Sequence, residues 1–412
     1  MEELNLPRQS QAEVIVAGHI CLDIIPTIRG GQIGLDELFV PGKLVDVGKA
    51  VISTGGAVSN TGIALHRLGS NVRLMGKVGN DLFGEAILSI LGEHNPTLVD
   101  GMIVAPGENS SYSIVISPPR TDRIFLHSTG ANDTYSAADL RDEQLQEARL
   151  FHFGYPPLMR GMYRNNGEEL ALLLKKVKTA GLTVSLDLAK PDPASDAGSA
   201  DWRAILTYAL PYVDVFLPSF EEIVYMLHRD QYEAWMRESD SGNLISFATG
   251  DFLSQIAEEL LEMGAAIVGL KLGEHGLYVR TTSEEARLSA MGGCSPTEDL
   301  RENWLDNEII SSCYQVDVVG TTGAGDCTIA GFLYSLLMGM NLEHALQTAV
   351  GVGAFNVEHT DAVSGIRTGS EVWERMNKGW AKREMKLDLP NWVLNEHQVW
   401  IGPHHKKFKR SR

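Results

Sequence analysis

The sequence predicts a three-layer α/β domain with a largely parallel central sheet. The run AEVIVAG at 12–18 is typical of a buried strand, and TVSLDL at 183–188 is typical of another. Between such runs lie segments of helical periodicity. The segment 168–181 places four apolar residues on one helical face before it stops at a glycine, and 252–264 repeats this order before AAIVGLKLG. Repeated strand–helix–strand units indicate a parallel sheet covered by helices on both faces.

Two regions interrupt this alternation. Residues 24–52 are rich in glycine and proline with short strand-like pieces, and residues 102–128 contain the β-like runs SYSIVISPP and DRIFLH. Neither region has a helical pattern. We therefore expect them to pair into a small sheet outside the main one, placed as a lid over a site.

Composition and charge exclude several classes of protein. The chain has 412 residues, of which 44% are hydrophobic and 21% charged, as in a soluble globular protein. The formal charge of −18 argues against a nucleic-acid partner, because a phosphate backbone demands a basic surface. No apolar run is long enough to span a membrane, and the first residues lack a secretory pattern, so we expect a cytoplasmic protein.

The cysteines predict neither a disulfide nor a metal site. Cys21, Cys294, Cys313 and Cys327 show no C-x-x-C spacing and no metal-ligand pattern with histidines. We expect reduced and mostly buried thiols.

Two segments fall outside the regular pattern. Residues 282–312 are polar, acidic and aperiodic, and are expected to form an exposed insertion. Residues 371–412 form a C-terminal extension, and we expect Trp380, Trp392 and Trp400 to pack it onto the body; its basic end, HHKKFKRSR, is expected to be solvated.

The stretch VDVVGTTGAGDCTIAGFLYSLLMGM at 316–340 predicts a glycine-rich turn followed by a buried helix. Apolar residues recur on one helical face after Asp326, so a helix should begin near it. The start of a helix carries unpaired N–H groups and partial positive charge, which suit an anion. Gly320 and Gly325 have the spacing of a phosphate-binding loop, but Asp326 stands where that motif needs lysine. It is either an ordinary helix N-cap or a base that accepts a proton from an alcohol attacking a phosphoryl group.

Two stretches in this order resemble the signatures of one family. TTGAGDCTIAGFL at 321–333 resembles the C-terminal signature of the ribokinase-like (phosphofructokinase-B, PfkB) carbohydrate kinases, and STGGAVSNTGIALHRLGSNVRLMGKVGNDLFGE at 53–85 resembles the N-terminal one. The resemblance implies a ribokinase-like three-layer αβα domain over 13–370 with lid segments at about 24–52 and 102–128. It also implies ATP- and Mg²⁺-dependent phosphorylation of a hydroxyl group on a small-molecule sugar, and a possible homodimer.

The resemblance also assigns roles to individual residues. Asp326 would be the general base, and the backbone of Gly323, Ala324 and Gly325 would form the anion hole. The positions that would hydrogen-bond the substrate are Asp23, Gly55, Gly56 and Asn60. Those on the nucleotide side are Lys271, Gly273, Gly276, Thr321 and Thr322. The glycine pairs could instead be plain turns, and Asn60 a buried polar group of a helix.

Two positions depart from the family pattern. Gly320 replaces the aspartate that coordinates an activating monovalent cation in many members, so activation by K⁺ through that ligand is not expected. In PSFEE, Ser219 replaces the asparagine of the Asn-x-x-Glu element associated with Mg²⁺, while Glu222 keeps the acidic position and could hold the metal through water.

Three functions follow, in this order. The first is an ATP-dependent sugar kinase. The second is a nucleoside kinase of the same fold, for which Arg123, His127 and Asn132 are candidate contacts in the lid, although no aromatic pair is evidently placed to sandwich a base. The third is a sugar- or nucleotide-binding regulatory protein without catalysis, which Gly320 and Ser219 favour and Asp326 opposes.

Overall fold

The central sheet of the computed structural model has ten strands within the residues that it describes, which are 12–28, 38–117, 124–146, 148–239 and 242–409. Six neighbouring strands are parallel, in the order β4 (Val72–Met75), β1 (Val14–Gly18), β9 (Leu150–Gly154), β10 (Thr183–Leu186), β11 (Val215–Phe216) and β12 (Ile267–Lys271). Four antiparallel strands complete the sheet, namely β13 (Leu277–Thr281), β14 (Glu308–Ser311), β16 (Trp400–Ile401) and β15 (Val393–Leu394).

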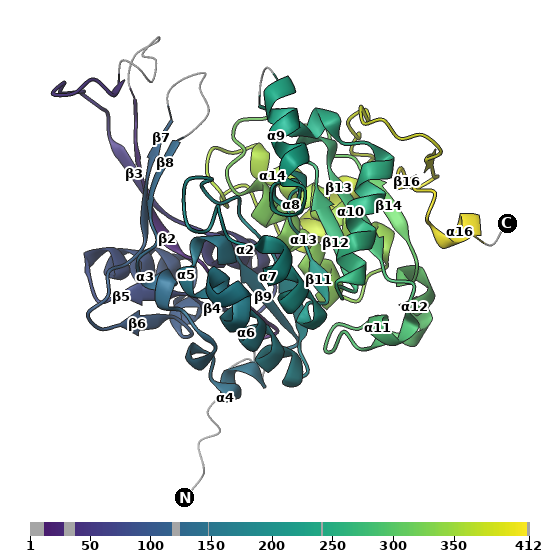
Figure 1. The fold of residues 1–412 in the computed structure, drawn as a ribbon, viewed down its shortest axis with the longest axis horizontal. Coiled ribbons are helices and arrows are strands. Elements are labelled where there is room, and N and C mark those ends of the chain that lie inside the picture. Colours follow the sequence, from purple (N-terminus) through teal and green to yellow (C-terminus); the bar gives the residue numbers. More distant parts are fainter. Residues whose placement is uncertain (1–11, 29–37, 118–123, 147, 240–241, 410–412) are drawn as a thin grey trace, which may run out of the picture.

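Helices cover both faces of this sheet (Figure 1). One apolar core contains side chains from α2 (Ala57–Leu68), α3 (Leu82–His94), α13 (Ala324–Leu337) and α14 (Leu342–Val357). The other contains side chains from α6 (Glu168–Thr179), α7 (Trp202–Ala209), α8 (Phe220–Leu227) and α10 (Gly250–Glu262). Strand β1 contributes Val14 and Val16 to the first core and Ile15 and Ala17 to the second, as alternation along a strand requires. The predicted fold class is confirmed.

Three further α-helices precede α10 in the chain. They are α4 (Asp142–Leu145), α5 (Arg160–Tyr163) and α9 (Arg229–Glu238). In the described part of the chain, no helix combines the length and apolarity needed to cross a bilayer.

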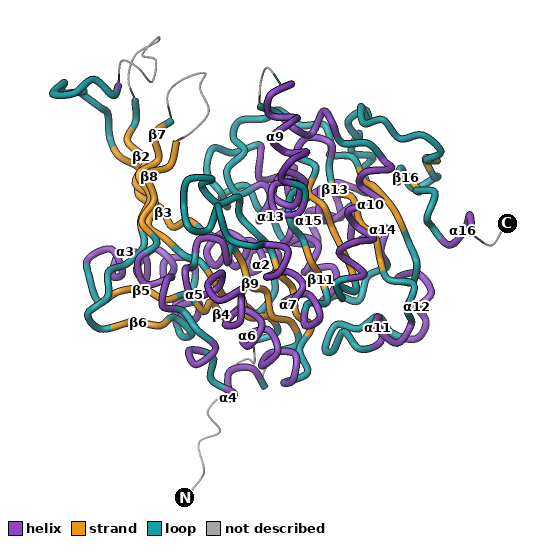
Figure 2. Tube along the Cα trace, in the orientation of Figure 1, coloured by secondary structure: helices purple, strands orange, loops and turns teal. Residues whose placement is uncertain are grey.

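A four-stranded sheet stands away from the main one (Figures 1 and 2). Its order is β3 (Ala50–Gly55), β2 (Cys21–Pro26), β7 (Tyr112–Ile116) and β8 (Ile124–Ser128). We call this sheet the lid. The predicted lid segments supply most of it, but β6 (Ile103–Ala105) pairs with β5 (Lys77–Gly79) in a separate ribbon, and residues 29–37 and 118–123 lie outside the described residues.

The interpretation of 282–312 as an exposed polar insertion is wrong. This segment contains α11 (Glu285–Ser289), α12 (Glu298–Trp304) and β14, and β14 is a buried strand of the main sheet between β13 and β16. Leu288, Met291 and Trp304 are buried in the first core. Their spacing is irregular because loops separate the short elements, which hides the apolar pattern in the sequence.

The C-terminal extension packs onto the body. It contains α15 (Gly369–Asn377), the edge strands β15 and β16, and α16 (Lys406–Lys409). Trp380 Nε1 donates to the carbonyl of Gln315 at 3.0 Å, and Trp392 is buried in the second core. The extension therefore adds two strands to the sheet edge.

Candidate active site

The helix expected near Asp326 begins two residues earlier than its periodicity predicted. Gly323 is the N-cap, with φ +73°, and α13 runs from Ala324. A side chain at Gly323 would overlap Ala362, so the turn requires glycine. Asp326 is thus the third helical residue, and the interpretation of it as the N-cap is wrong. The N–H of Ala324 donates to the carbonyl of Thr321 at 3.3 Å across the turn, while the N–H of Gly325, in the first turn, has no partner four residues back within the helix.

Both carboxylate oxygens of Asp326 accept a hydrogen bond from a side chain of another element. Asn60 Nδ2, on α2, donates to Oδ2 at 2.9 Å, and the hydroxyl of Tyr155 donates to Oδ1 at 2.8 Å. The side chain is 3% exposed. Burial raises the pKa of Asp326 above its usual value, while the Asn60 hydrogen bond and the charge of Lys271 oppose this shift. The carboxyl is fixed in one orientation.

Two cavities meet at the start of α13. The first, which we call the lid cavity, has a volume of about 710 Å³ and is lined by Asp326, Gly323 and residues of the lid. The second, of about 570 Å³, is lined by Ala324, Gly325 and other residues from the last third of the chain, and we call it the C-terminal cavity. Thr321 lines both. A group passing from one cavity to the other would therefore pass the positive end of α13.

Glycines make room for side chains in the lid cavity. Asp23, on β2, lies so close to Gly55 that a methyl group there would overlap its Oδ2 atom. A side chain at Gly56, which has φ +88°, would come within 2.6 Å of His19 Nδ1. The glycine pair is therefore more than a turn, since its bare backbone lets an acid and an imidazole lie against it.

Asn60 lies between the carboxylate and the lid cavity. Its amide nitrogen is bound to Asp326, and its Oδ1 atom is buried without a hydrogen-bond partner. Asn60 lines the lid cavity, so this unpaired acceptor suits a donor hydroxyl of a ligand. It is both a buried helix residue and an available contact.

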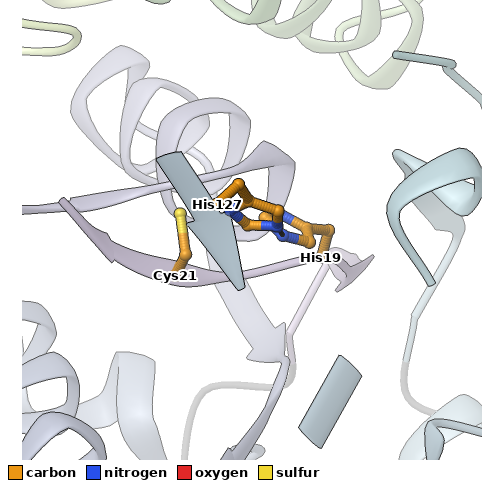
Figure 3. A group of neighbouring side chains, drawn as sticks. All are labelled: His19, Cys21 and His127. Atoms are coloured by element: carbon orange, nitrogen blue, oxygen red, sulfur yellow. Dashed lines mark hydrogen bonds between the residues drawn. The ribbon is translucent and has the colours of Figure 1, made fainter. Parts of the chain in front are cut away.

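Two histidines and a cysteine lie side by side in the same cavity (Figure 3). His19 follows β1, Cys21 begins β2, and His127 lies on the lid strand β8. The two Nε2 atoms of the histidines are 3.2 Å apart. Burial lowers the pKa of both histidines, so the imidazoles are neutral at pH 7. The spacing of the cysteines in the sequence did not indicate this cluster, because His127 is far away from Cys21 in the chain.

The residues predicted as ligand contacts in the lid have different positions in the structure. His127 lines the cavity, whereas Asn132 is buried and both accepts from the backbone N–H of Ile20 and donates to its carbonyl. Asn132 is therefore a structural link rather than a ligand contact. Arg123 lies outside the described residues.

The residues expected on the nucleotide side line two different cavities. Lys271, Gly273, Gly276 and Thr321 line the C-terminal cavity, whereas Thr322 lines the lid cavity. Gly273 has φ +54° and open space beside it. Gly276 has φ +101°, and a side chain there would overlap the carbonyl of Ser311 on β14, so this glycine is also required by packing.

The C-terminal extension contributes to this cavity, which the sequence did not indicate. Arg383 lines it and forms an ion pair with Glu274 at 2.6 Å. The backbone N–H of Arg383 donates to the carbonyl of Cys313 at 2.8 Å, and Lys382 Nζ donates to Ser311 Oγ at 2.8 Å. Residues 380–383 are thus hydrogen-bonded along 311–315, and they hold Arg383 at the cavity wall.

A lysine and two acids lie behind the start of α13. Lys271 Nζ forms an ion pair with Asp187 Oδ1 at 2.6 Å, and the second oxygen of Asp187 is buried without a partner. Burial lowers the pKa of Lys271, but the charges of Asp187 and Glu222 outweigh that effect and raise it, so the lysine is charged. A cation facing the phosphate side would attract an anionic ligand.

Ser219 and Glu222 cap helix α8. The Ser219 N–H donates to Glu222 Oε2 at 2.7 Å, and the Glu222 N–H donates to Ser219 Oγ at 3.3 Å. One oxygen of Glu222 is therefore committed to the cap. Burial raises the pKa of Glu222.

Gly320 has no space for a side chain. A methyl group there would lie 2.7 Å from the carbonyl of His359 and 3.1 Å from Cα of Thr360. The backbone at 359–360 therefore occupies the place where the family aspartate would begin.

Tyr155 is the main residue that sequence reasoning missed. It follows β9 in FHFGYPP with φ +64°, a conformation rare for a non-glycine residue. A polar residue directly after a parallel strand is a signal that could have found it, because ligands bind at the carboxyl ends of such strands.

Comparison with known proteins agrees with this geometry. The model of the "pfkB family carbohydrate kinase" matches residues 12–368. The chain is 24% identical over 383 residues to the probable fructokinase-6, chloroplastic, of Arabidopsis thaliana, covering 90% of this chain and 84% of that protein. It is 26% identical over 345 residues to the 2-dehydro-3-deoxygluconokinase of Bacillus subtilis, covering 79% and 87%.

Comparison with solved structures matches the fold to that of a sugar kinase. The structure of Arabidopsis thaliana ribokinase complexed with ribose and ATP matches with a TM-score of 0.64 and 19% identity, covering 88% of this chain and 98% of that one. The fold and site thus define a phosphotransferase with an alcohol group as acceptor. The chain belongs to the pfkB family of carbohydrate kinases, which confirms the resemblance.

Proposed function

We propose that this protein transfers the γ-phosphoryl group of ATP to a hydroxyl of an uncharged sugar. The observation that carries the proposal is the position of Asp326 at the junction of the two cavities, beside the start of α13. The sugar occupies the lid cavity and the nucleotide the C-terminal cavity.

The ionised Asp326 is the general base. It takes the proton from the sugar hydroxyl as that oxygen forms its bond to the γ-phosphorus, and the bond between this phosphorus and the bridging oxygen breaks to leave ADP. Asn60 and Tyr155 hold the two carboxylate oxygens. The N–H groups of the first turn, from Gly323 to Gly325, bind the oxygens of the migrating group, where oriented donors lower the barrier.

Polar groups beside the base suit sugar hydroxyls. Asp23 accepts from hydroxyl groups, and the unpaired Oδ1 of Asn60 accepts another. Besides Asp326, the described residues of the cavity wall include Asp23 and Asp192 as acids and Lys190 as a cation that already lies 3.9 Å from Glu221. Acids outnumber cations on this wall, and this balance of charge favours a neutral sugar over a sugar acid or a phosphorylated sugar.

A nucleoside kinase is the second candidate. Phe125 and Tyr163 both line the lid cavity, which gives this candidate aromatic surface for a base. A regulatory protein without catalysis is opposed by the intact, doubly hydrogen-bonded base.

The acids beside Lys271 fit Mg²⁺. Asp187 has a buried oxygen without a partner, and Glu222 has one oxygen outside the cap. Magnesium in kinases is commonly bound by one or two carboxylates, waters and substrate phosphates. Asp187 and Glu222 would hold it through water, and the ion would neutralise charge on the phosphates.

We also propose that the protein forms a homodimer through the lid. Ile52 and Leu126 are large apolar side chains about half exposed, and they lie on the same face of the lid, opposite Phe125, which lines the lid cavity. A second copy would cover them.

The test is ADP release from purified protein with MgATP and a panel of hexoses, pentoses, sugar acids, phosphorylated sugars and nucleosides. We expect turnover with a neutral hexose or pentose, and a loss of about 10²-fold or more in Asp326→Asn with nucleotide binding retained. Turnover confined to nucleosides would establish the second candidate. Wild-type activity in Asp326→Asn would refute the base assignment.

A further inference from the structure

The cluster of His19, Cys21 and His127 has the donors of a transition-metal site. One nitrogen of each imidazole and the thiol sulfur all lie within 4.8 Å of one another. The Nε2 atoms of the two histidines are 3.2 Å apart. This is close to the separation of about 3.3 Å between two nitrogen ligands of a tetrahedral zinc ion with Zn–N bonds of about 2.0–2.1 Å. Among the described residues, no other group of three such donors comes together.

The surroundings support metal ligation. Ser113 Oγ lies 3.0 Å from Nδ1 of His127, so it can accept the proton on that nitrogen while Nε2 binds a metal. His19 Nδ1 is buried without a partner, and so the second imidazole is not committed to the protein on that side. Both histidines line the lid cavity, where a metal ion could reach them.

A carboxylate lies next to the thiol of the cluster. The Cys21 thiol donates to Asp23 Oδ1 at 3.3 Å, and both residues line the lid cavity. Asp23 is thus placed beside the three donors. On metal binding the thiol would release its proton to solvent.

We propose that His19, Cys21 and His127 bind one Zn²⁺ ion in the lid cavity and that this ion excludes the sugar. Nitrogen and sulfur donors select zinc over magnesium, so the Mg²⁺ of the nucleotide does not compete for the site. Three protein ligands leave a fourth position open, which Asp23 or a water can fill.

The metal would also hold the lid closed. His127 lies on β8, Cys21 on β2, and His19 after β1 of the main sheet, so one ion ties two lid strands to the body (Figure 3). Asp23 is proposed to bind sugar hydroxyls and lies next to Cys21. Zinc at this place therefore competes with the sugar and leaves the C-terminal cavity open. The competition between zinc and the sugar rests on the proposed function, whereas the binding of zinc does not.

The binding is tested first with the metal alone. Calorimetric titration of the metal-free protein with Zn²⁺, without sugar or nucleotide, should give one site of micromolar or tighter affinity. Cys21→Ser and His127→Gln should each weaken it at least 10-fold. Cys313→Ser is the matched control, because this thiol lines the other cavity, and it should bind zinc as the wild type does. Co²⁺ should give the near-ultraviolet absorption of a cobalt–thiolate bond, which Cys21→Ser should lose.

The consequence is tested on turnover. Zinc should raise the KM for the sugar without lowering kcat, and a chelator should reverse this. No zinc binding by the metal-free protein, or unchanged binding in both cluster variants that retain the wild-type circular dichroism, would refute the site. If the site binds zinc but no panel compound is phosphorylated, the proposed function fails and the metal site stands. Inhibition competitive with MgATP alone would refute the exclusion of sugar.

Discussion

The hydroxyl of Tyr155 donates to Oδ1 of Asp326 at 2.8 Å from a backbone in the left-handed conformation. Such a backbone costs about 1–3 kcal/mol in a non-glycine residue and persists only where its surroundings hold it. The hydrogen bond connects the carboxyl end of β9 to the first turn of α13, so two elements of the main domain fix the orientation of the base.

Tyr155→Phe should therefore move the pH dependence of kcat. With Asp326 as the proposed base, the rate should require the ionised carboxylate and fall as pH drops through the pKa of Asp326, which burial already raises. The tyrosine hydrogen bond opposes that rise, and so its loss raises the pKa further and shifts the acid limb to higher pH. Loss of a hydrogen bond to a charged group, worth about 1.5–3 kcal/mol, should lower kcat roughly 10- to 100-fold. An unchanged acid limb would contradict this role.

Gly55→Ala should weaken sugar binding specifically. The added methyl group would overlap Oδ2 of Asp23 and displace this carboxylate from the place proposed for its contact with the sugar. We expect the KM for the sugar to rise about 10-fold or more, which corresponds to about 1.4 kcal/mol, while the KM for ATP stays the same. Gly92→Ala on α3 is the matched control, because a methyl group there meets open space. Equal sugar kinetics in the two variants would show that Asp23 does not contact the sugar.

Sequence reasoning found the part of the site that local patterns encode. The strand–helix alternation depends on residues a few positions apart, and the same is true of the glycine-rich turn before α13. The fold class could therefore be predicted, and the start of this helix could be predicted to within two residues. The helix start was misplaced because the apolar face begins after Asp326, whereas the turn ends at Gly323, whose conformation the periodicity does not record.

The contacts between distant segments could not be predicted. Tyr155 meets Asp326 across 171 residues, and His19 meets His127 across 108. Nothing in either local sequence specifies its partner. Likewise β14 is buried because β13 and β16 flank it, and its four residues, EIIS, are too short to reveal that from their own pattern.

Arg383→Ala should raise the KM for ATP and leave the KM for the sugar unchanged. The guanidinium of Arg383 lines the C-terminal cavity, and the backbone of this residue is hydrogen-bonded to Cys313. Arg383 lies outside residues 12–368, which the family model matches. We expect an increase of roughly 3- to 10-fold, because the charge is partly solvated. Lys378→Ala, which removes an exposed ion pair on α15, is the control and should change neither constant. A rise in the KM for the sugar alone would place the nucleotide elsewhere.

Turnover should not depend on K⁺ bound through position 320. The family aspartate is absent there, and the backbone carbonyl of His359 lies only 2.7 Å from where its Cβ would be. Replacing KCl by NaCl or by a tetramethylammonium salt at constant ionic strength should therefore change kcat less than about twofold, since constant ionic strength leaves screening unchanged. Gly320→Asp should not create activation by K⁺, because the overlap with residues 359 and 360 would distort the turn before it could supply a ligand; the free energy of unfolding of this variant should fall instead. A strong and saturable activation of the wild type by K⁺ would mean that other oxygen atoms near this turn bind the ion, and that the lost aspartate has been replaced by another ligand.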